Sequence, residues 1–280
     1  MNMSYSNMIW SQFRRNKVAV FCLGVLLFFV VVACLAGVIY PEGYDAQNIS
    51  EAQADFSWSH PIGTDNFGRD LLTRIVYGAR YTLIIGFGCA TGSAIVGVIL
   101  GILAGMNSTL DFWIMRVVDI MMGVPHFTLS LCLVMVLGKD LIYLMIALII
   151  TKSPVFARVM RAQVLTVQRS DFIEASSSLG ASKFWLAVKH IIPNSISPIL
   201  VQYTYQVGAC IMAGASLGFI GWGVQAPTPE WGVMISAGKS YIRAYWPSAI
   251  FPGIALIIVI YALNLLGDGL RDAFDPRLKQ

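Results

Sequence analysis

Residues 18–40 read VAVFCLGVLLFFVVVACLAGVIY, a run that contains no charged side chain. A helix needs about 20 mainly apolar residues to cross the roughly 30 Å of hydrocarbon in a bilayer. Arg14, Arg15 and Lys17 precede the run in the way that basic residues precede a secretory signal, but the run is too long for a signal core. We therefore expect a membrane-spanning helix that is retained in the mature chain.

The composition of the whole chain extends this conclusion beyond the first run. Of the 280 residues, 57% are hydrophobic and 12% are charged, whereas soluble domains carry about 25% charged residues. The net charge of +4 is spread thinly, so no nucleic-acid-binding surface is indicated. We predict an all-α polytopic membrane protein whose membrane domain covers residues 18–270, with cytoplasmic tails at 1–17 and 271–280 and six transmembrane helices near 18–40, 82–106, 113–137, 141–160, 196–219 and 249–270.

The distribution of Lys and Arg predicts the orientation, because cytoplasmic loops carry an excess of these residues. With both termini in the cytoplasm, six cations lie outside and twelve inside, and Lys152 falls within the fourth helix. The outer six are Arg69, Arg74, Arg80, Lys139, Lys239 and Arg243, and the inner twelve are Arg14, Arg15, Lys17, Arg116, Arg158, Arg161, Arg169, Lys183, Lys189, Arg271, Arg277 and Lys279.

One inner loop has the features of a docking element for another protein. Residues 171–185 read DFIEASSSLGASKFW, and IIPN follows at 191–194. The small residues from Ala175 to Ser178 allow close approach of another surface, Gly180 ends or bends the short helix, and Pro193 stops the next one. The alternative is an ordinary amphipathic cytoplasmic helix.

The same loop resembles the EAA loop in permease subunits of bacterial ABC importers, whose pattern is E-A-A, three residues, G, nine residues and I-x-L-P. The matching positions are Glu174, Ala175, Gly180 and Pro193, and the departures, which keep small or mostly apolar character, are Ser176, His190 and Ile192. The resemblance implies coupling to a partner ATPase through Glu174, Ala175, Ser176, Gly180, Ala181 and Phe184.

Three further segments narrow the resemblance. Residues 60–70 (HPIGTDNFGRD), 227–232 (PTPEWG) and 264–276 (NLLGDGLRDAFDP) look like the dipeptide/oligopeptide/nickel permease family, and more specifically the second permease of such systems. This likeness runs from residue 15 to residue 279. It implies the type I ABC importer permease fold with a cytoplasmic coupling helix, in the lipid of a bacterial plasma membrane. It also implies a homologous second permease, two ATPase subunits that bind ATP and Mg, and an extracytoplasmic solute-binding protein.

We predict that the two outer segments, 60–70 and 227–232, form the docking surface for that binding protein. The candidate docking residues are Asp65, Arg69, Asp70, Glu230 and Trp231. We expect Asp70 to start a helix that lies on the outer membrane surface, because a carboxylate favours a helix N-terminus. We expect Trp231 to present an aromatic contact. The alternative is that these segments only anchor the second helix and the membrane interface.

Polar groups inside the predicted helices are few, which makes each a candidate for the translocation path. Lys152, Asp119 and His126 are these candidates. Lys152 is placed to attract a peptide carboxylate, and the alternative is a structural pair or kink whose charge reaches inner water. His126 follows Pro125 and is either a metal contact or, more simply, a packing residue.

Glycines recur at one-turn intervals in the second predicted helix, at positions 88, 92, 97, 101 and 105. Such spacing places them on one face and predicts close packing against another helix. A ligand passage along this face is the alternative.

Other chemistry is not indicated. The five cysteines (Cys22, Cys34, Cys89, Cys132 and Cys210) lie in apolar stretches without a C-x-x-C pair, so we expect small hydrophobic packing residues. Residues 232–240 nearly spell a phosphate-binding loop, but five residues separate the glycines instead of four and no strand precedes them. We expect no enzyme activity and no cofactor in this chain, with energy supplied by the partner ATPases.

The function that these features indicate is one transmembrane subunit of an importer for dipeptides or short oligopeptides. Nickel or a metal chelate is the alternative within the same family. An ATP-independent secondary transporter is the alternative from another class, and the EAA-type loop argues against it.

Overall fold

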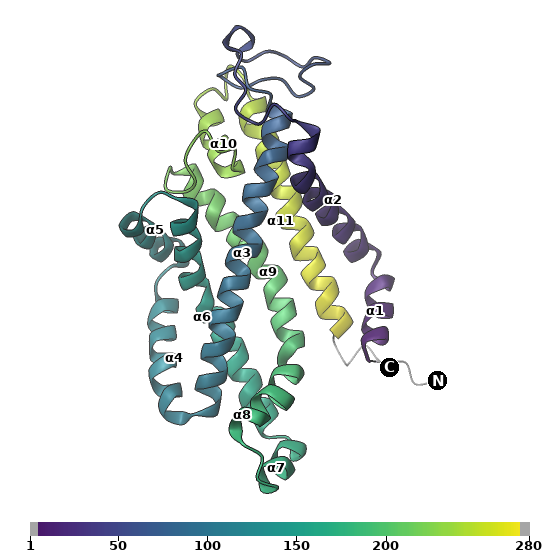
Figure 1. The fold of residues 1–280 in the computed structure, drawn as a ribbon, viewed down its shortest axis with the longest axis vertical. Coiled ribbons are helices and arrows are strands. Elements are labelled where there is room, and N and C mark those ends of the chain that lie inside the picture. The colour runs from purple at the N-terminus through teal and green to yellow at the C-terminus, as the bar shows by residue number, and fades with distance from the viewer. Residues whose placement is uncertain (1–4, 275–280) are drawn as a thin grey trace.

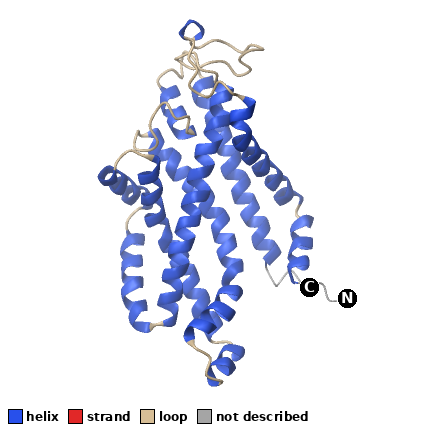
Figure 2. Cartoon of the chain, in the orientation of Figure 1, coloured by secondary structure: helices blue, strands red, loops and turns tan. Residues whose placement is uncertain are grey.

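The computed structural model describes residues 5–274 and folds them almost entirely into helices (Figures 1 and 2). Arg277 and Lys279, which we expect in the cytoplasm, lie outside the described residues. The α-helices are α1 (Tyr5–Arg15), α2 (Lys17–Ile39), α3 (Leu71–Met106), α4 (Ser108–Gly123), α5 (His126–Leu137), α6 (Leu141–Gln168), α7 (Asp171–Ser178), α8 (Lys183–Leu186), α9 (Ile192–Phe219), α10 (Trp231–Lys239) and α11 (Pro247–Phe274). A short 3₁₀-helix (Ile49–Glu51) and a π-helical turn (Ala187–Ile191) complete the helical elements.

Five helical segments between residues 5 and 274 are long and apolar enough to cross a membrane, and α4 with α5 makes a sixth if the pair is one broken span. The two halves of this pair meet at 97°. The prediction of one continuous helix over 113–137 is therefore wrong. Pro125 cannot donate a backbone hydrogen bond, and it forces the preceding Val124 into extended backbone with φ −96° and ψ 135°.

The helix that contains the predicted span at 82–106 begins eleven residues earlier, at Leu71. Asp70 caps α3, since its Oδ2 accepts a 2.7 Å hydrogen bond from the backbone N–H of Thr73, and this confirms the expected helix start. The helix then continues without interruption to Met106. The expectation of a separate helix on the membrane surface before residue 82 is wrong, because Leu71 and Arg74 in its first turns are already buried by the rest of the chain.

The helices form a bundle in which α3 and α6 run side by side (Figure 1). α9 and α11 pack on α3 and on each other, α2 packs on α11 and α3, and α4 and α5 pack on α6. Residues 41–70 and 220–246 cover one end of the bundle, here called the loop end, and α7 projects from the opposite end, here called the α7 end. α1 and the last turn of α11 both lie toward the α7 end (Figure 1).

The repeated glycines of α3 are the surface on which α6 packs. A Cβ atom at Gly97 would lie 2.5 Å from the carbonyl oxygen of Ser153, and one at Gly101 would lie 2.6 Å from the carbonyl oxygen of Ala157. At Gly105 it would lie 2.5 Å from Val164 Cγ1. The backbones of α3 and α6 therefore touch, which confirms the prediction of close helix packing.

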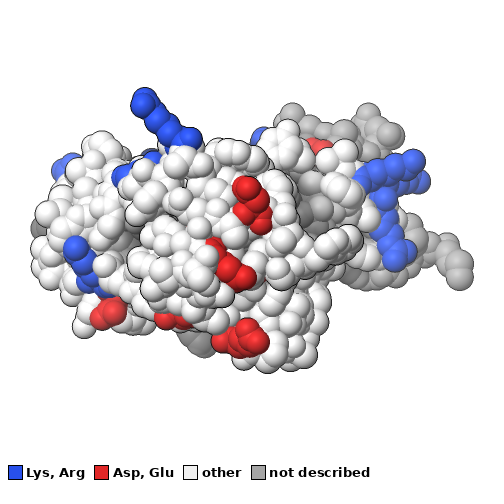
Figure 3. Space-filling view, turned by 90° about the horizontal axis from the view of Figure 1, so that it is seen from above, with Lys and Arg blue, Asp and Glu red and all other residues white. Residues whose placement is uncertain are grey.

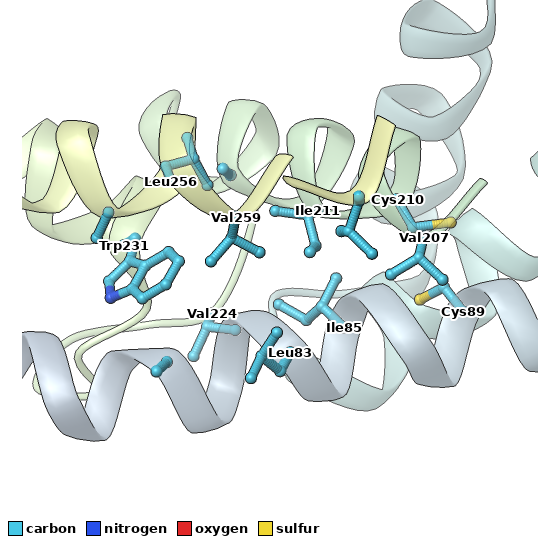
Figure 4. Packing of buried hydrophobic residues seen from close by; sticks show 14 of the residues in the cluster. Leu83, Ile85, Cys89, Val207, Cys210, Ile211, Val224, Trp231, Leu256 and Val259 are labelled. Atoms are coloured by element: carbon cyan, nitrogen blue, oxygen red, sulfur yellow. The ribbon is translucent and has the colours of Figure 1, made fainter. Parts of the chain in front are cut away.

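The main core joins α3, α9, α10 and α11 and is shown in Figure 4. Trp231 fills its end nearest the loops, and Cys89 and Cys210 lie at its other end, from α3 and α9 (Figure 4). All five cysteines are free thiols. Cys22, Cys89 and Cys210 are buried as expected, whereas Cys34 and Cys132 lie on the surface of this chain.

Gly101→Leu should destabilise the bundle, because its side chain would collide with the backbone of α6. Overpacking of this kind costs about 1–3 kcal/mol, so the midpoint of thermal unfolding in detergent or lipid should fall. Gly24→Leu is the matched control, since a Cβ there meets nothing within 4 Å and the two changes raise helix propensity equally. Equal midpoints for both variants would contradict the proposed contact.

Candidate functional site

The segment that connects α6 to α9 forms a hairpin at the α7 end, residues 169–191, here called the α7 hairpin. α7 ends at Ser178, Gly180 two residues later adopts φ +86°, and the backbone N–H of Ala181 donates to the carbonyl of Ser176 at 3.2 Å. This left-handed helix ending favours glycine because a side chain would clash with the backbone. The spacing of Gly180 after Glu174 therefore fixes where the short helix stops and the chain turns.

Apolar side chains of the α7 hairpin point away from the rest of the chain. Leu179 is 90% exposed and Phe184 is 79% exposed, and Glu174 and Ala175 are exposed beside them. A shallow hollow of about 440 Å³ is lined by Ser176, Leu179, Gly180, Ala181, Ser182 and Trp185. Exposed apolar groups around small residues mark a surface that another protein covers. Leu179 and Trp185 escaped the sequence analysis, although both lie within the motif.

The α7 hairpin is attached to the bundle by a few contacts. Ile191, its last residue, packs with Met160 and Val164 of α6. Within the hairpin, Ile173 is buried, and the ring of His190 lies 5.7 Å from that of Phe172 and 4.9 Å from that of Trp185. His190 belongs to the π-helical turn that leads into α9. Turns of this kind often occur at functional sites, and the local sign of this one in the sequence is His190, where the EAA pattern has Ile.

At the loop end, a buried ionic network ties the 41–70 loop to α3. Arg69 Nε donates to Asp65 Oδ2 at 2.7 Å, and Arg74 Nε lies 3.5 Å from the same oxygen. Arg74 also donates to the carbonyls of Tyr44 and Pro227, at 3.1 and 3.2 Å. Since one side chain of α3 holds both outer segments, the network fixes the shape of this end.

Glu230 and Trp231 are packed inside the loop end. The carboxylate of Glu230 accepts hydrogen bonds from the backbone N–H groups of Gly232 and Val233, at 2.9 and 3.0 Å, and so caps α10. Trp231 is fully buried, and its Nε1 donates to the carbonyl of Ile75 at 3.0 Å. The expectation that Trp231 presents an aromatic contact is therefore wrong, because α10 packs on α9 and α11 and the Trp231 ring lies against Gly78 of α3.

The buried position of Glu230 changes the pKa of its carboxyl group. Burial raises the pKa of its carboxyl above the ordinary value for a glutamate, and the hydrogen bonds from Gly232, Val233 and Thr82 oppose that shift. With Asp65, Arg69 and Trp231, Glu230 forms the interior of the predicted docking segments, and Asp70 serves as the cap of α3. These residues therefore stabilise the conformation of the outer loops from the interior of the loop end.

The surface of the 41–70 loop exposes a different set of side chains. Trp58 is completely exposed, and Ile49 and Phe56 are 74% and 55% exposed. The loop also exposes the carboxylates of Glu42, Asp45, Glu51 and Asp55, and acidic groups gather on the loop end in Figure 3. Sequence analysis missed this surface, because no periodic pattern distinguishes an exposed Trp in a loop.

The structure brings together two of the three polar candidates within the helices. His126 begins α5, and Ser130 in the next turn lies 2.9 Å, between hydroxyl oxygens, from Thr151, the residue before Lys152 on α6. Asp119 of α4 is instead paired with Arg158, with 2.7 Å between Oδ1 and the guanidinium, and both side chains are exposed. Among residues 5–274, no group of three or more His, Cys, Asp or Glu side chains is placed to hold a metal ion.

Comparison with known proteins places the chain in a family. Residues 97–280 match the family described as "Binding-protein-dependent transport system inner membrane component". The chain belongs to this family of inner-membrane permeases. Residues 4–58 also match the N-terminal TM domain of oligopeptide transport permease C.

Individual relatives of the permease cover almost its whole length. It is 39% identical to the dipeptide transport system permease protein DppC of Alkalihalophilus pseudofirmus, over 96% of this chain and 89% of that protein. It is also 39% identical to the di/tripeptide transport system permease protein DppC of Pseudomonas aeruginosa, over 96% and 91%. An inward-facing structure of the MetNI methionine ABC transporter shares the fold, with a TM-score of 0.60 and 20% identity over 73% of this chain and 98% of that one. The type I importer permease fold that the sequence predicts is confirmed.

The raised pKa of Glu230 predicts a pH-dependent stability. The folded chain holds this proton to higher pH than the unfolded chain does, so the stability that protonation contributes is complete below the unfolded pKa of about 4.3 and is lost as pH rises through the folded pKa. Glu230→Gln removes the titration. Its unfolding midpoint relative to wild type should therefore rise as the pH increases above the unfolded pKa of about 4.3. Glu42→Gln, at an exposed position of the same end, should show no such trend, and a constant difference for Glu230→Gln would refute the assignment.

Proposed function

We propose that this permease is a transmembrane subunit of an ATP-driven importer that moves dipeptides or short oligopeptides into the cell. The observation that carries the proposal is the α7 hairpin, which exposes Leu179 and Phe184 around a helix end fixed by Gly180. The names of its relatives, which are dipeptide permeases, support the substrate class. The α7 end and both termini lie in the cytoplasm, in agreement with the Lys and Arg distribution.

The proposal includes the proteins with which the permease assembles. Two ATPase subunits bind ATP and Mg and receive the α7 hairpins of this chain and of a homologous second permease. The residues that meet the ATPase are Glu174, Ala175, Ser176, Gly180, Ala181 and Phe184, with Leu179 beside them. Closure of the ATPases on ATP moves the hairpins, and the helices switch between outward and inward openings because binding energy differs between the two states.

An extracytoplasmic solute-binding protein docks on the loop end. Trp58 supplies an exposed aromatic anchor, and the acidic groups of the 41–70 loop complement a basic surface on the partner. The predicted docking residues Asp65, Arg69, Asp70, Glu230 and Trp231 act by holding this surface in shape. A rigid loop loses less entropy on docking than a flexible one.

The membrane domain covers residues 18–270, between cytoplasmic tails at 1–17 and 271–280. Its translocation path passes Lys152 and His126. Asp119 lies nearer the cytoplasmic mouth, where its charge is balanced by Arg158.

Gly180→Arg tests the coupling role of the α7 hairpin. The side chain would place bulk and charge where the ATPase packs, and nothing in this chain lies within 4 Å of a Cβ at that position, so the permease itself should still assemble. ATP hydrolysis stimulated by the loaded binding protein should fall at least about tenfold in the reconstituted complex. Gly180→Ala is the control, because it introduces the same backbone strain at φ +86° without the bulk and charge of Arg. Full stimulation with Gly180→Arg incorporated would reject the coupling role.

Trp58→Ala tests the docking surface. The ring is completely exposed, so its removal should leave the stability of the permease unchanged and weaken the affinity for the binding protein about tenfold or more, as loss of an interface anchor does. Trp113→Ala, which removes an exposed Trp of α4, should leave the affinity at the wild-type value. The docking assignment fails if titration of the binding protein onto the complex gives the same affinity for Trp58→Ala as for wild type.

A further inference from the structure

Lys152 of α6 has no counterion among residues 5–274. Lys152 lies in the interior of α6 and is partly buried. The salt bridges found among residues 5–274 all involve other cations. An ionised group at this depth of a membrane protein requires a partner or an aqueous cavity.

The absence of a counterion is a property of the sequence around Lys152. No Asp or Glu occurs within α3, α5, α6 or α9, which are the helices that surround this part of α6. The two carboxylates of α4, Asp111 and Asp119, are already paired with Arg161 and Arg158. A change of side-chain rotamer within α6 and its neighbours therefore cannot supply the missing negative charge.

The surroundings of Lys152 favour an anion further. Ser130 of α5, whose hydroxyl donates to the carbonyl of His126 at 2.8 Å, lies 2.9 Å from Oγ1 of Thr151, the residue before Lys152. The Nδ1 atom of His126 is buried without a hydrogen-bond partner, and no side chain caps the first turn of α5. The free N–H groups and the positive end of the α5 dipole therefore lie near Lys152.

We infer that Lys152, with His126 and the first turn of α5, binds the C-terminal carboxylate of the peptide as it crosses the permease. This assignment rests on the proposed function and names the part of the substrate that the membrane domain recognises. A carboxylate fits because it accepts several charge-assisted hydrogen bonds at once. Broken transmembrane helices present their N-termini to anionic substrate groups in other transporters.

An apolar hollow borders the first turn of α5. Phe127, the residue after His126, lines an apolar hollow of about 270 Å³ together with Met212 of α9 and Ile235 of α10. A peptide side chain can occupy this hollow while the carboxylate reaches Lys152. The negative charge near Lys152 can also come from a carboxylate of the second permease. The crosslinking test below distinguishes that carboxylate from the C-terminus of the peptide.

We compare three variants in the complete transporter, reconstituted with its loaded binding protein. They are Lys152→Met, Lys152→Arg and the control Lys139→Met. Uptake of a dipeptide with a free carboxylate should fall about tenfold or more for Lys152→Met, recover for Lys152→Arg and stay unchanged for Lys139→Met, an exposed lysine just before α6. Lys152→Met should not lower the thermal stability of the peptide-free complex, because without peptide Lys152 has no anionic partner to lose. Uptake by Lys152→Met at the wild-type rate, or a parallel loss of stability, would overturn the inference.

A zero-length crosslink identifies the carboxylate directly. The complex is arrested with peptide and a non-hydrolysable ATP analogue and treated with a water-soluble carbodiimide, which joins a carboxyl group to an amine in contact with it. Mass spectrometry should find the peptide's C-terminus attached to Lys152, and no adduct at this position with Lys152→Arg. A crosslink from Lys152 to the second permease, or none, contradicts the inference. If the wild-type complex takes up no peptide at all, the proposed function fails instead.

Discussion

Close contact between α3 and α6 holds the membrane-spanning part of the chain together. At Gly97, Gly101 and Gly105 a single methyl group would lie within 2.5 to 2.6 Å of atoms of α6, so the two backbones touch over successive turns. In lipid no hydrophobic effect drives helices together, and van der Waals packing of this kind takes its place. The pair forms a stiff unit that runs from the loop end to the α7 end (Figure 1), and α6 leads directly into the α7 hairpin.

The loop end is attached to this unit by polar groups that are satisfied inside the protein. Arg74, from the second turn of α3, donates to carbonyls of both outer segments, and Trp231 donates to the carbonyl of Ile75 on the same helix. Removing one partner from such a buried network leaves the other unsatisfied, which costs more than an exposed contact does. A force on the 41–70 loop therefore acts on α3, and through α3 on α6 and the α7 hairpin.

The sequence determined the helical class because apolar runs and glycine spacing are local signals. It also indicated that a helix starts at Asp70, since the signal of a helix N-terminus lies in neighbouring residues. It failed where the outcome depended on distant partners. The stretch after Asp70 looks amphipathic because Arg74 is charged, yet its partners are 30 and 153 residues away in sequence. Trp231 is buried because Gly78 leaves space for its ring, with an added Cβ only 2.7 Å from Trp231 Cδ1.

The break between α4 and α5 explains why Lys152 differs from the other cations of α6. α4 runs beside the later turns of α6, and its carboxylates pair with Arg158 and Arg161. It ends at Gly123, and α5 turns away by 97°, so at the level of Lys152 the chain offers a helix N-terminus in place of a carboxylate. An anion held there contacts both α5 and α6. Its binding energy then depends on how these two helices are arranged, and this dependence is the condition under which a ligand shifts a conformational equilibrium.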